Sequence, residues 1–309
     1  MPRVLFVSLL TAAFFLLFPA GNSAWARGAG PARTGETALD PRMSIIPSPV
    51  DRGGPGRVIL SDLDLIHEPA GVFDGKPIFF FATRKGLTGL FGADIMLEPG
   101  LYPLIVNYID GRGQPFQLSQ TLRVQDKDYG TRNISVPQSQ VDLSAADLDR
   151  AAKEKALTDA ALATVSPIKL WRGPFLEPVK AAINSSFGRQ TRMNGILNPR
   201  PHAGADYRAP AGAPVQAPAA GRVILAGDHF FAGNSIYIDH GQGLISMYFH
   251  LSKILVSEGQ VLEKGEGPIG LVGQTGRVTG AHLHYGVYLN GARIDPPAFR
   301  KMTDDLEDY

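Results

Sequence analysis

Short β-prone runs, separated by glycine and proline, recur along almost the whole chain and restrict it to a mainly β fold. Examples are the runs 58–60, 78–81 and 104–106, which are rich in Val, Ile, Leu and Phe. The 309 residues include 35 Gly and 24 Pro, which favours many turns and short strands. One segment, near residues 144–163, has a helical pattern instead. The sequence therefore predicts two groups of strands joined by a helix.

The first group of strands is predicted at residues 56–140, after a flexible lead-in at 27–55 that is rich in Gly, Ala, Pro and Arg. Asp110-Gly111 is a hairpin signal. The residues after it place four apolar side chains on one face of a strand. A module of this size with such strands is typical of a small immunoglobulin-like β-sandwich. The four side chains are Phe116, Leu118, Leu122 and Val124.

A linker helix is predicted at 141–165. Ser144 is a suitable N-cap, and Asp147 three residues later forms an approximate capping box. Pro167 follows the helix. Strands resume over a second region, 166–300, where Asn290-Gly291 is another hairpin signal. The chain ends in an acidic tail, 301–309, in which Thr303 to Tyr309 are expected to be frayed.

Residues 1–26 have the pattern of a cleaved signal peptide. Arg3 precedes a mostly apolar run at 4–18, and Ala24-Trp25-Ala26 fits the small-x-small cleavage rule. The alternative, a membrane anchor, is disfavoured because the run is shorter than the roughly 20 residues that a spanning helix needs. We therefore expect an exported protein, periplasmic or secreted, without a stable membrane anchor after cleavage.

Charge and cysteine content exclude several classes of function. Lys and Arg number 30 against 29 Asp and Glu, so the chain lacks the basic excess of a nucleic-acid binder. The absence of cysteine excludes disulfides, Cys-ligated zinc and a thiol nucleophile. Any metal must be held by histidine and carboxylate side chains.

Histidines carry the strongest functional signal, because six of the seven fall between residues 202 and 284. His282 and His284 are two residues apart next to a predicted strand, so both rings can point to one face while Leu283 faces the core. His202 and Asp206 are separated by Ala-Gly-Ala, which lets the backbone bend toward a common ion. The other histidines of the cluster are His229, His240 and His250.

Two imidazoles and a carboxylate are good zinc ligands, and three protein ligands leave a position for water, as in catalytic zinc sites. His250 is the remaining candidate for acid–base chemistry. Spacing alone permits a shared site but does not establish that these segments meet. A glycine motif at 265–270 matches a dinucleotide-binding pattern but lacks the βαβ context that such a site requires.

Four arginines lie before and around the first histidine motif. They have two interpretations: a solvated rim, or contacts to carboxylates of a peptide substrate. These residues are Arg189, Arg192, Arg200 and Arg208.

Three segments, HAGAD (202–206), YFHLS (248–252) and GQTGRVTGAHLHYGV (273–287), resemble the signatures of the lysostaphin-type, LytM-like zinc metalloendopeptidases. Their order and separations also match, and the resemblance covers about residues 168–299. The β module and the helix resemble, less specifically, the N-terminal module and linker of some bacterial members.

The resemblance implies that His202, Asp206 and His284 hold one zinc ion per catalytic domain. It implies that His250 and His282 flank the metal-bound water, one accepting its proton and the other helping to stabilise the oxyanion. The family fold is an antiparallel β-sheet with an open groove. Members cut peptide bonds in peptidoglycan, in D-Ala–diaminopimelate cross-links or in glycine bridges.

Two other functions are compatible with the same fold. The chain could be a non-catalytic regulator of another cell-wall hydrolase, although such relatives typically lack some metal ligands and none is missing here. It could also be a wall-binding protein in which the β module has the main role.

Overall fold

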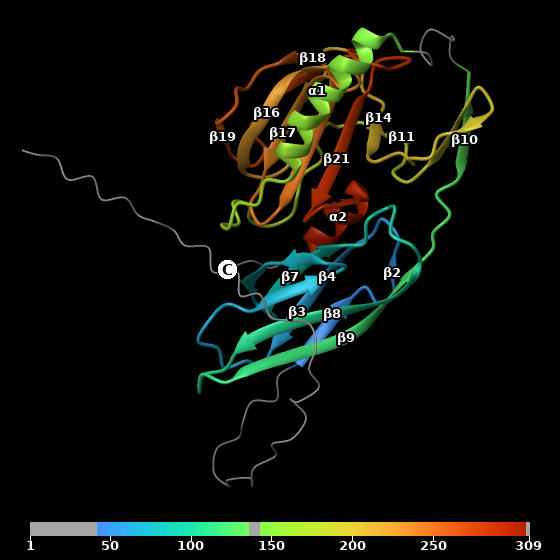
Figure 1. Cartoon of the computed structure of the whole chain (residues 1–309). Coiled ribbons are helices and arrows are strands. Elements are labelled where there is room, and N and C mark those ends of the chain that lie inside the picture. The colour runs from blue at the N-terminus through green and yellow to red at the C-terminus, as the bar shows by residue number, and fades with distance from the viewer. Residues whose placement is uncertain (1–41, 136–142, 307–309) are drawn as a thin grey trace, which may run out of the picture. The chain divides into compact units, whose positions relative to one another are not determined.

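Strands dominate the computed structural model, which describes residues 42–135 and 143–306. The strands from the first part of the chain, blue to green in Figure 1, and those from the last part, orange to red, build separate sheets. The predicted signal peptide, 1–26, lies outside the described residues. Within the described part, the mainly β prediction is confirmed.

The N-terminal module consists of two sheets. Four antiparallel strands form the first, in the order β1 (Arg42–Ile46), β3 (Pro55–Ser61), β7 (Gly86–Gly92) and β6 (Phe80–Thr83). Five strands form the second, in the order β2 (Val50–Asp51), β9 (Pro115–Gln125), β8 (Gly100–Ile109), β4 (Ala70–Phe73) and β5 (Lys76–Ile78).

The two sheets share one apolar core, to which side chains from both contribute. Leu104 and Val106 of β8 are fully buried and belong to the same cluster as Val58 and Leu60 of β3. The hairpin expected at Asp110-Gly111 joins β8 to β9.

Two expectations for this module were wrong. The lead-in, 27–55, was expected to be flexible, but its described part contains β1 and β2 and the first residue of β3. These strands form because β1 pairs with β3 and β2 pairs with β9. The run at 78–81 is not one strand either, since β5 ends at Ile78 and β6 begins at Phe80.

A ten-stranded sheet forms the C-terminal region. Its main path is β11 (Ile183–Ser185), β14 (Ala205–Tyr207), β21 (Leu283–Leu289), β18 (Leu244–Ile254), β17 (Gly233–Asp239), β16 (Gly221–His229) and β19 (Val261–Leu262). Three short strands extend it, namely β15 (Pro214–Val215), β20 (Gly270–Val272) and β22 (Ala292–Ile294).

The core of this region lies beneath the central strands, where Tyr248, Leu251, Leu283 and Val287 are fully buried. Asn290-Gly291 forms the predicted hairpin turn between β21 and β22. The values of φ are +47° at Asn290 and +82° at Gly291, the left-handed conformation that two-residue hairpin turns require.

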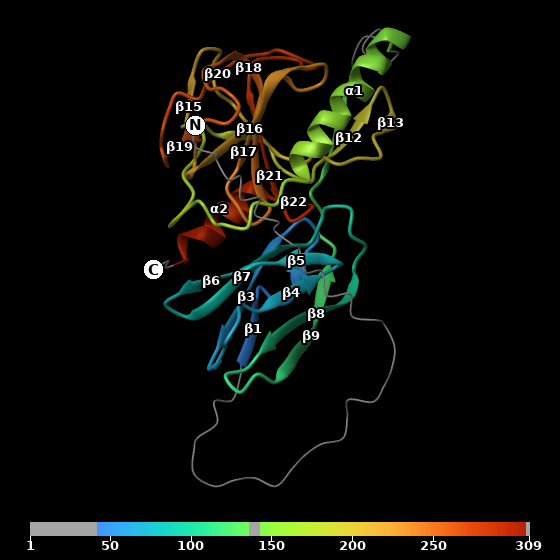
Figure 2. The ribbon, with the colours of Figure 1, turned by 60° about the vertical axis from the view of Figure 1, so that its left-hand side comes forward.

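A small three-stranded sheet joins the two parts of the chain. The strand β10 (Thr131–Ile134) follows the N-terminal module and pairs in parallel with β12 (Gln190–Met193), which pairs in turn with β13 (Ile196–Leu197). Figures 1 and 2 both place the green β10 segment beside the yellow β12–β13 hairpin.

The predicted linker helix is α1 (Ala145–Leu162), and the Ser144 side chain accepts a hydrogen bond from the Asp147 amide, as the capping pattern indicated. The helix is attached to the end of β16. Arg150 forms an ion pair with Asp228 at 3.0 Å, and Glu154 accepts a hydrogen bond from the Phe230 amide at 2.6 Å.

The acidic tail was expected to be frayed from Thr303, and this was wrong for its described part, 303–306. Helix α2 (Pro296–Asp304) continues through it, with Asp295 as N-cap and prolines in the first turn. Thr303 is fully buried and accepts a hydrogen bond from the Phe175 amide at 3.0 Å. Leu306 is buried in the core of the C-terminal region.

Direct contacts connect the N-terminal module to this region, and the described residues belong to one compact unit. The guanidinium group of Arg293 forms two hydrogen bonds with the carboxylate of Asp94, at 2.7 and 3.0 Å. The Asp295 amide donates to the Gly53 carbonyl at 2.8 Å. Neither helix of the described residues is long and apolar enough to cross a membrane.

Candidate metal centre

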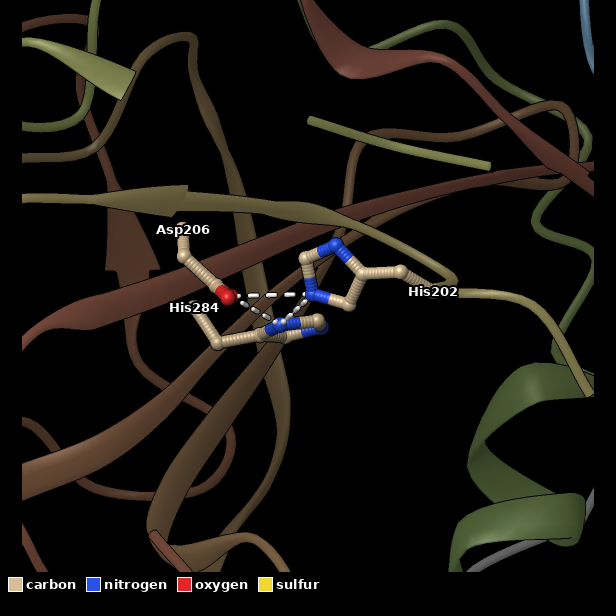
Figure 3. Close-up of side chains that lie close together, drawn as sticks. All are labelled: His202, Asp206 and His284. Atoms are coloured by element: carbon tan, nitrogen blue, oxygen red, sulfur yellow. Dashed lines mark hydrogen bonds and ion pairs between the residues drawn. The ribbon is translucent and has the colours of Figure 1, made fainter. Parts of the chain in front are cut away.

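Neighbouring strands of the large sheet bring the predicted ligands together. Asp206 on β14 and His284 on β21 are direct partners in the antiparallel register. His202 lies in the loop that leads into β14, four residues before Asp206. Figure 3 shows the three side chains directed toward one point.

The potential ligand atoms of these three residues form a small triangle. His202 Nε2 and His284 Nδ1 each lie 2.9 Å from Asp206 Oδ1 and 3.0 Å from each other. One ion can therefore reach all three atoms at the roughly 2.0–2.2 Å typical of zinc bound to nitrogen and oxygen. Among the described residues, this is the group whose donor atoms are placed to hold a metal ion.

Surrounding groups fix the orientation of the ligand rings. The Ser186 carbonyl lies 3.0 Å from His202 Nδ1. A carbonyl can only accept, so Nδ1 carries the proton and the lone pair of Nε2 faces the triangle. The His284 ring stacks on Phe249, its cross-strand neighbour, with centroids 5.2 Å apart. Gly204 leaves room for this ring, since a Cβ there would lie 2.6 Å from His284 Nε2.

The electrostatics of the triangle suit a cation. Burial would raise the pKa of Asp206, but hydrogen bonds with His202 and His284 outweigh burial and hold the pKa far below its usual range. Burial also lowers the pKa of His284. The centre therefore offers an anionic carboxylate beside a neutral imidazole, the protonation states that metal binding requires.

His250 and His282 lie beside the triangle. Their ring centroids are 4.8 Å apart, and His282 Nε2 is 3.8 Å from Asp206 Oδ1. Nδ1 of His250 donates to the Thr275 carbonyl at 3.0 Å, and Nδ1 of His282 donates to the Gly280 carbonyl at 2.8 Å. Both rings thus keep Nε2 available as a proton acceptor.

His250 has an uncommon backbone conformation and a lowered ring pKa. Its φ of +64° lies in the left-handed region, and its amide donates to the Ala232 carbonyl at 2.8 Å. Burial first, and then the nearby His284 and His282, lowers the pKa of its ring to about 4. The ring is therefore neutral near pH 7, as a general base must be.

An open groove of about 440 Å³ contains all five residues. Of the four arginines singled out in the sequence, only Arg200 lines this groove. Arg132 of β10 and Arg277 also line it, and sequence reasoning missed both. No local motif marks Arg132, because it enters the groove through the pairing of β10 with a strand 59 residues further along.

The two remaining histidines of the cluster lie outside the groove, as expected for structural residues. His229 is buried and forms a hydrogen bond with Ser235 at 2.7 Å. His240 is fully buried between the Ala220 carbonyl and the Ser246 hydroxyl.

Three convergent ligands, with two free imidazole nitrogens in an open groove, define the kind of site that metal-dependent hydrolases use. The comparisons with known proteins agree. Residues 200–296 match the model of peptidase family M23. A solved structure from Pseudomonas aeruginosa, described as an M23 peptidase, is 35% identical with a TM-score of 0.63, and the alignment covers 82% of this chain and 95% of that one.

The chain therefore belongs to peptidase family M23, which confirms the resemblance to lysostaphin-type enzymes. It is 45% identical over 116 residues to the peptidoglycan DD-endopeptidase ShyA of Vibrio cholerae, covering 38% of this chain and 27% of ShyA. It is 42% identical over 133 residues to the DD-carboxypeptidase/endopeptidase Mpg of Neisseria meningitidis, covering 42% of this chain and 30% of Mpg. The chain thus spans less than a third of these curated relatives.

Proposed function

We propose that this protein is a zinc-dependent endopeptidase that hydrolyses peptide bonds in bacterial peptidoglycan. The observation that carries the proposal is the convergence of His202, Asp206 and His284, with two free imidazole nitrogens beside them. The names of the similar proteins ShyA and Mpg support peptidoglycan peptides as the substrate.

Zinc, when bound by the three ligands, lowers the pKa of a bound water to about 7 and polarises the scissile carbonyl. The protein's own residues accept and donate the proton that is transferred during hydrolysis. His250 and His282 both line the groove and direct Nδ1 at a backbone carbonyl, so Nε2 of either ring is the atom that can accept a proton from the attacking water. The ring that has accepted it becomes a donor and can stabilise the oxyanion or protonate the leaving amine.

The same proposal assigns roles to the other parts of the chain. Residues 1–26 serve as a signal peptide, and the mature protein acts in the periplasm or outside the cell, without a membrane anchor or a nucleic-acid partner. The N-terminal module, with β1 and β2 included, is an immunoglobulin-like sandwich, 141–165 is a linker, and the peptidase domain begins at about residue 166. Two sheets around one core support the sandwich assignment.

The test is to incubate the purified mature protein with peptidoglycan sacculi, with and without a zinc chelator. Released fragments are identified by mass spectrometry. We expect chelator-sensitive release of peptides with new amino termini, which also identifies the bond. If zinc-loaded protein releases no peptides, the endopeptidase assignment is wrong, and the result favours a non-catalytic regulator of another cell-wall hydrolase.

His250→Ala and His282→Ala separate catalysis from metal binding. Both variants should retain zinc, because neither residue belongs to the ligand triangle, while hydrolysis should fall at least about 100-fold. His67→Ala, at an exposed position of the N-terminal module, is the matched control and should cleave at the wild-type rate.

A further inference from the structure

The wall of the metal groove is completed by a strand from outside the segment that matches the M23 family. The family match begins at residue 200, whereas β10 covers Thr131–Ile134. Arg132 is paired with Thr191 in the parallel register of β10 and β12, and its side chain lines the groove together with the metal ligands.

Arg132 is held in place by two neutral groups. Its Nε donates to Thr191 Oγ1 at 3.0 Å, and its Nη1 donates to Ser185 Oγ at 3.2 Å. Both hydroxyl-bearing residues are buried. Among the described residues, none of the ion pairs involves Arg132, and its side chain lines the groove.

The rest of the lining makes the groove basic. Arg200 and Arg277 also line it, and among the described lining residues Asp206, which belongs to the metal centre, is the one acidic residue. Arg277 contacts the Phe231 ring, with its guanidinium carbon 5.4 Å from the ring centroid, and is exposed. Arg132 differs from both other arginines because it is half-buried and fixed at two of its nitrogens.

The strand that carries Arg132 is anchored close to the metal centre. The Tyr129 ring lies directly against Gly188, where a Cβ would come within 2.3 Å of it. The Gly188 amide in turn donates to the His202 carbonyl at 2.8 Å. Tyr129 also donates its hydroxyl to the Arg52 carbonyl at 2.7 Å. Arg132 is therefore positioned relative to His202 by rigid packing, as a specificity-determining side chain must be.

We propose that Arg132 binds a carboxylate of the substrate, so that the protein selects peptides that carry a free carboxylate next to the scissile bond. This inference rests on the proposed endopeptidase function and names its substrate class. A pre-oriented guanidinium group is suited to this task, because its planar N–H donors match the two oxygens of a carboxylate. Peptides made of uncharged residues, such as glycine bridges, would gain nothing from it.

The test uses two synthetic cross-linked stem peptides that differ only at the residue beside the scissile bond, which carries either a side-chain carboxylate or the corresponding carboxamide. Hydrolysis is measured with the full mature chain, loaded with zinc, as separate kcat and KM values. Binding of both peptides is measured in parallel by calorimetry.

Wild-type protein should prefer the carboxylate peptide by about 10- to 100-fold, mainly through KM. Arg132→Gln should abolish this preference by raising KM for the carboxylate peptide to that for the amide peptide, and Arg132→Lys should restore part of the preference. The control is Arg192→Gln, on the adjacent β12 but not among the groove-lining residues, which should behave as wild type. Zinc content and melting temperature verify that each variant is folded.

Equal cleavage and binding of the two peptides by wild-type protein would overturn the inference and leave the endopeptidase assignment intact. Full discrimination in Arg132→Gln would overturn it as well. If neither peptide is cleaved but calorimetry still shows an Arg132-dependent preference for the carboxylate, the carboxylate site stands and the proposed hydrolysis fails.

Discussion

His240 should make the stability of the protein depend on pH, because its side chain is fully buried and burial favours the neutral ring. Nδ1 donates to the Ala220 carbonyl at 2.8 Å, so Nε2 must accept from Ser246 Oγ at 2.7 Å. The Tyr248 hydroxyl then donates to Ser246 Oγ at 2.8 Å. Protonation of Nε2 would turn it from an acceptor into a donor, force the Ser246 hydroxyl to reorient, and place a positive charge inside the core.

The size of the effect follows from the pKa. Burial lowers the pKa of His240 from 6.5 to about 4, although the Ala220 carbonyl and Asp239 act in the opposite direction. Between these two pH values the unfolded chain binds a proton that the native state does not, so stability falls as pH falls. At about 1.36 kcal/mol per pH unit, the full loss is about 3 kcal/mol, of which about 2 kcal/mol falls between pH 7 and pH 5.

Urea unfolding of zinc-loaded protein at pH 7, 6 and 5 measures this loss. His240→Asn can still offer an amide donor toward Ala220 but does not titrate. Its free energy of unfolding should therefore fall by about 2 kcal/mol less than that of wild type over this range. His67→Asn, at an exposed position, should keep the wild-type slope. Parallel pH dependence in wild type and His240→Asn would refute the reasoning.

Three further predictions concern the metal centre and the C-terminal helix. His284→Ala should reduce bound zinc from one ion per chain to nearly none, and hydrolysis should be lost with it. Zinc is measured by elemental analysis after gel filtration, and retained zinc would contradict the ligand assignment. Gly204→Ala should weaken zinc binding at least about tenfold, because its Cβ would come within 2.5 Å of the Tyr285 carbonyl oxygen and 2.6 Å of His284 Nε2. Zinc affinity is measured by competition titration, and an unchanged affinity would contradict this packing argument. Thr303→Val should lower the free energy of unfolding by about 1–3 kcal/mol, because the Phe175 amide loses its acceptor. Thr303→Ser keeps the hydroxyl and should lower the free energy of unfolding by less. Equal decreases in urea unfolding would show that packing, and not the hydrogen bond, is responsible.

Elements with local signals could be predicted from the sequence. The Asn290-Gly291 turn and the Ser144 cap depend on a few neighbouring residues, and both occur where the pattern placed them. The strands β1 and β2 could not be predicted, because their segment is interrupted by prolines and becomes strand only by pairing with β3 and β9. Helix α2 was missed because it is short, although its Asp295-Pro296 start was a usable signal.

The site was predictable to the extent that spacing within one strand or loop determines it. The alternation at 282–284 places His282 and His284 on one side of the chain and Leu283 in the core. That His284 meets Asp206, 78 residues away in sequence, depends on the register of β14 and β21, and only the family resemblance indicated it. Arg132 had no such indication, since parallel pairing of β10 with β12 is a non-local contact.

The contact of Tyr129 with Gly188 should couple metal binding to the local stability of the segment around Tyr129. An ion that binds only the native site stabilises every segment whose opening would disrupt that site, by about 4 kcal/mol when free metal exceeds its Kd 1,000-fold. Because Tyr129 contacts Gly188 and the Gly188 amide donates to the His202 carbonyl, local opening around Tyr129 would be expected to disturb the position of His202. Amide hydrogens in β10 should therefore exchange more slowly when zinc is added. The exchange rates of the β10 amides would then report whether the metal centre is occupied, although β10 contributes no ligand to it.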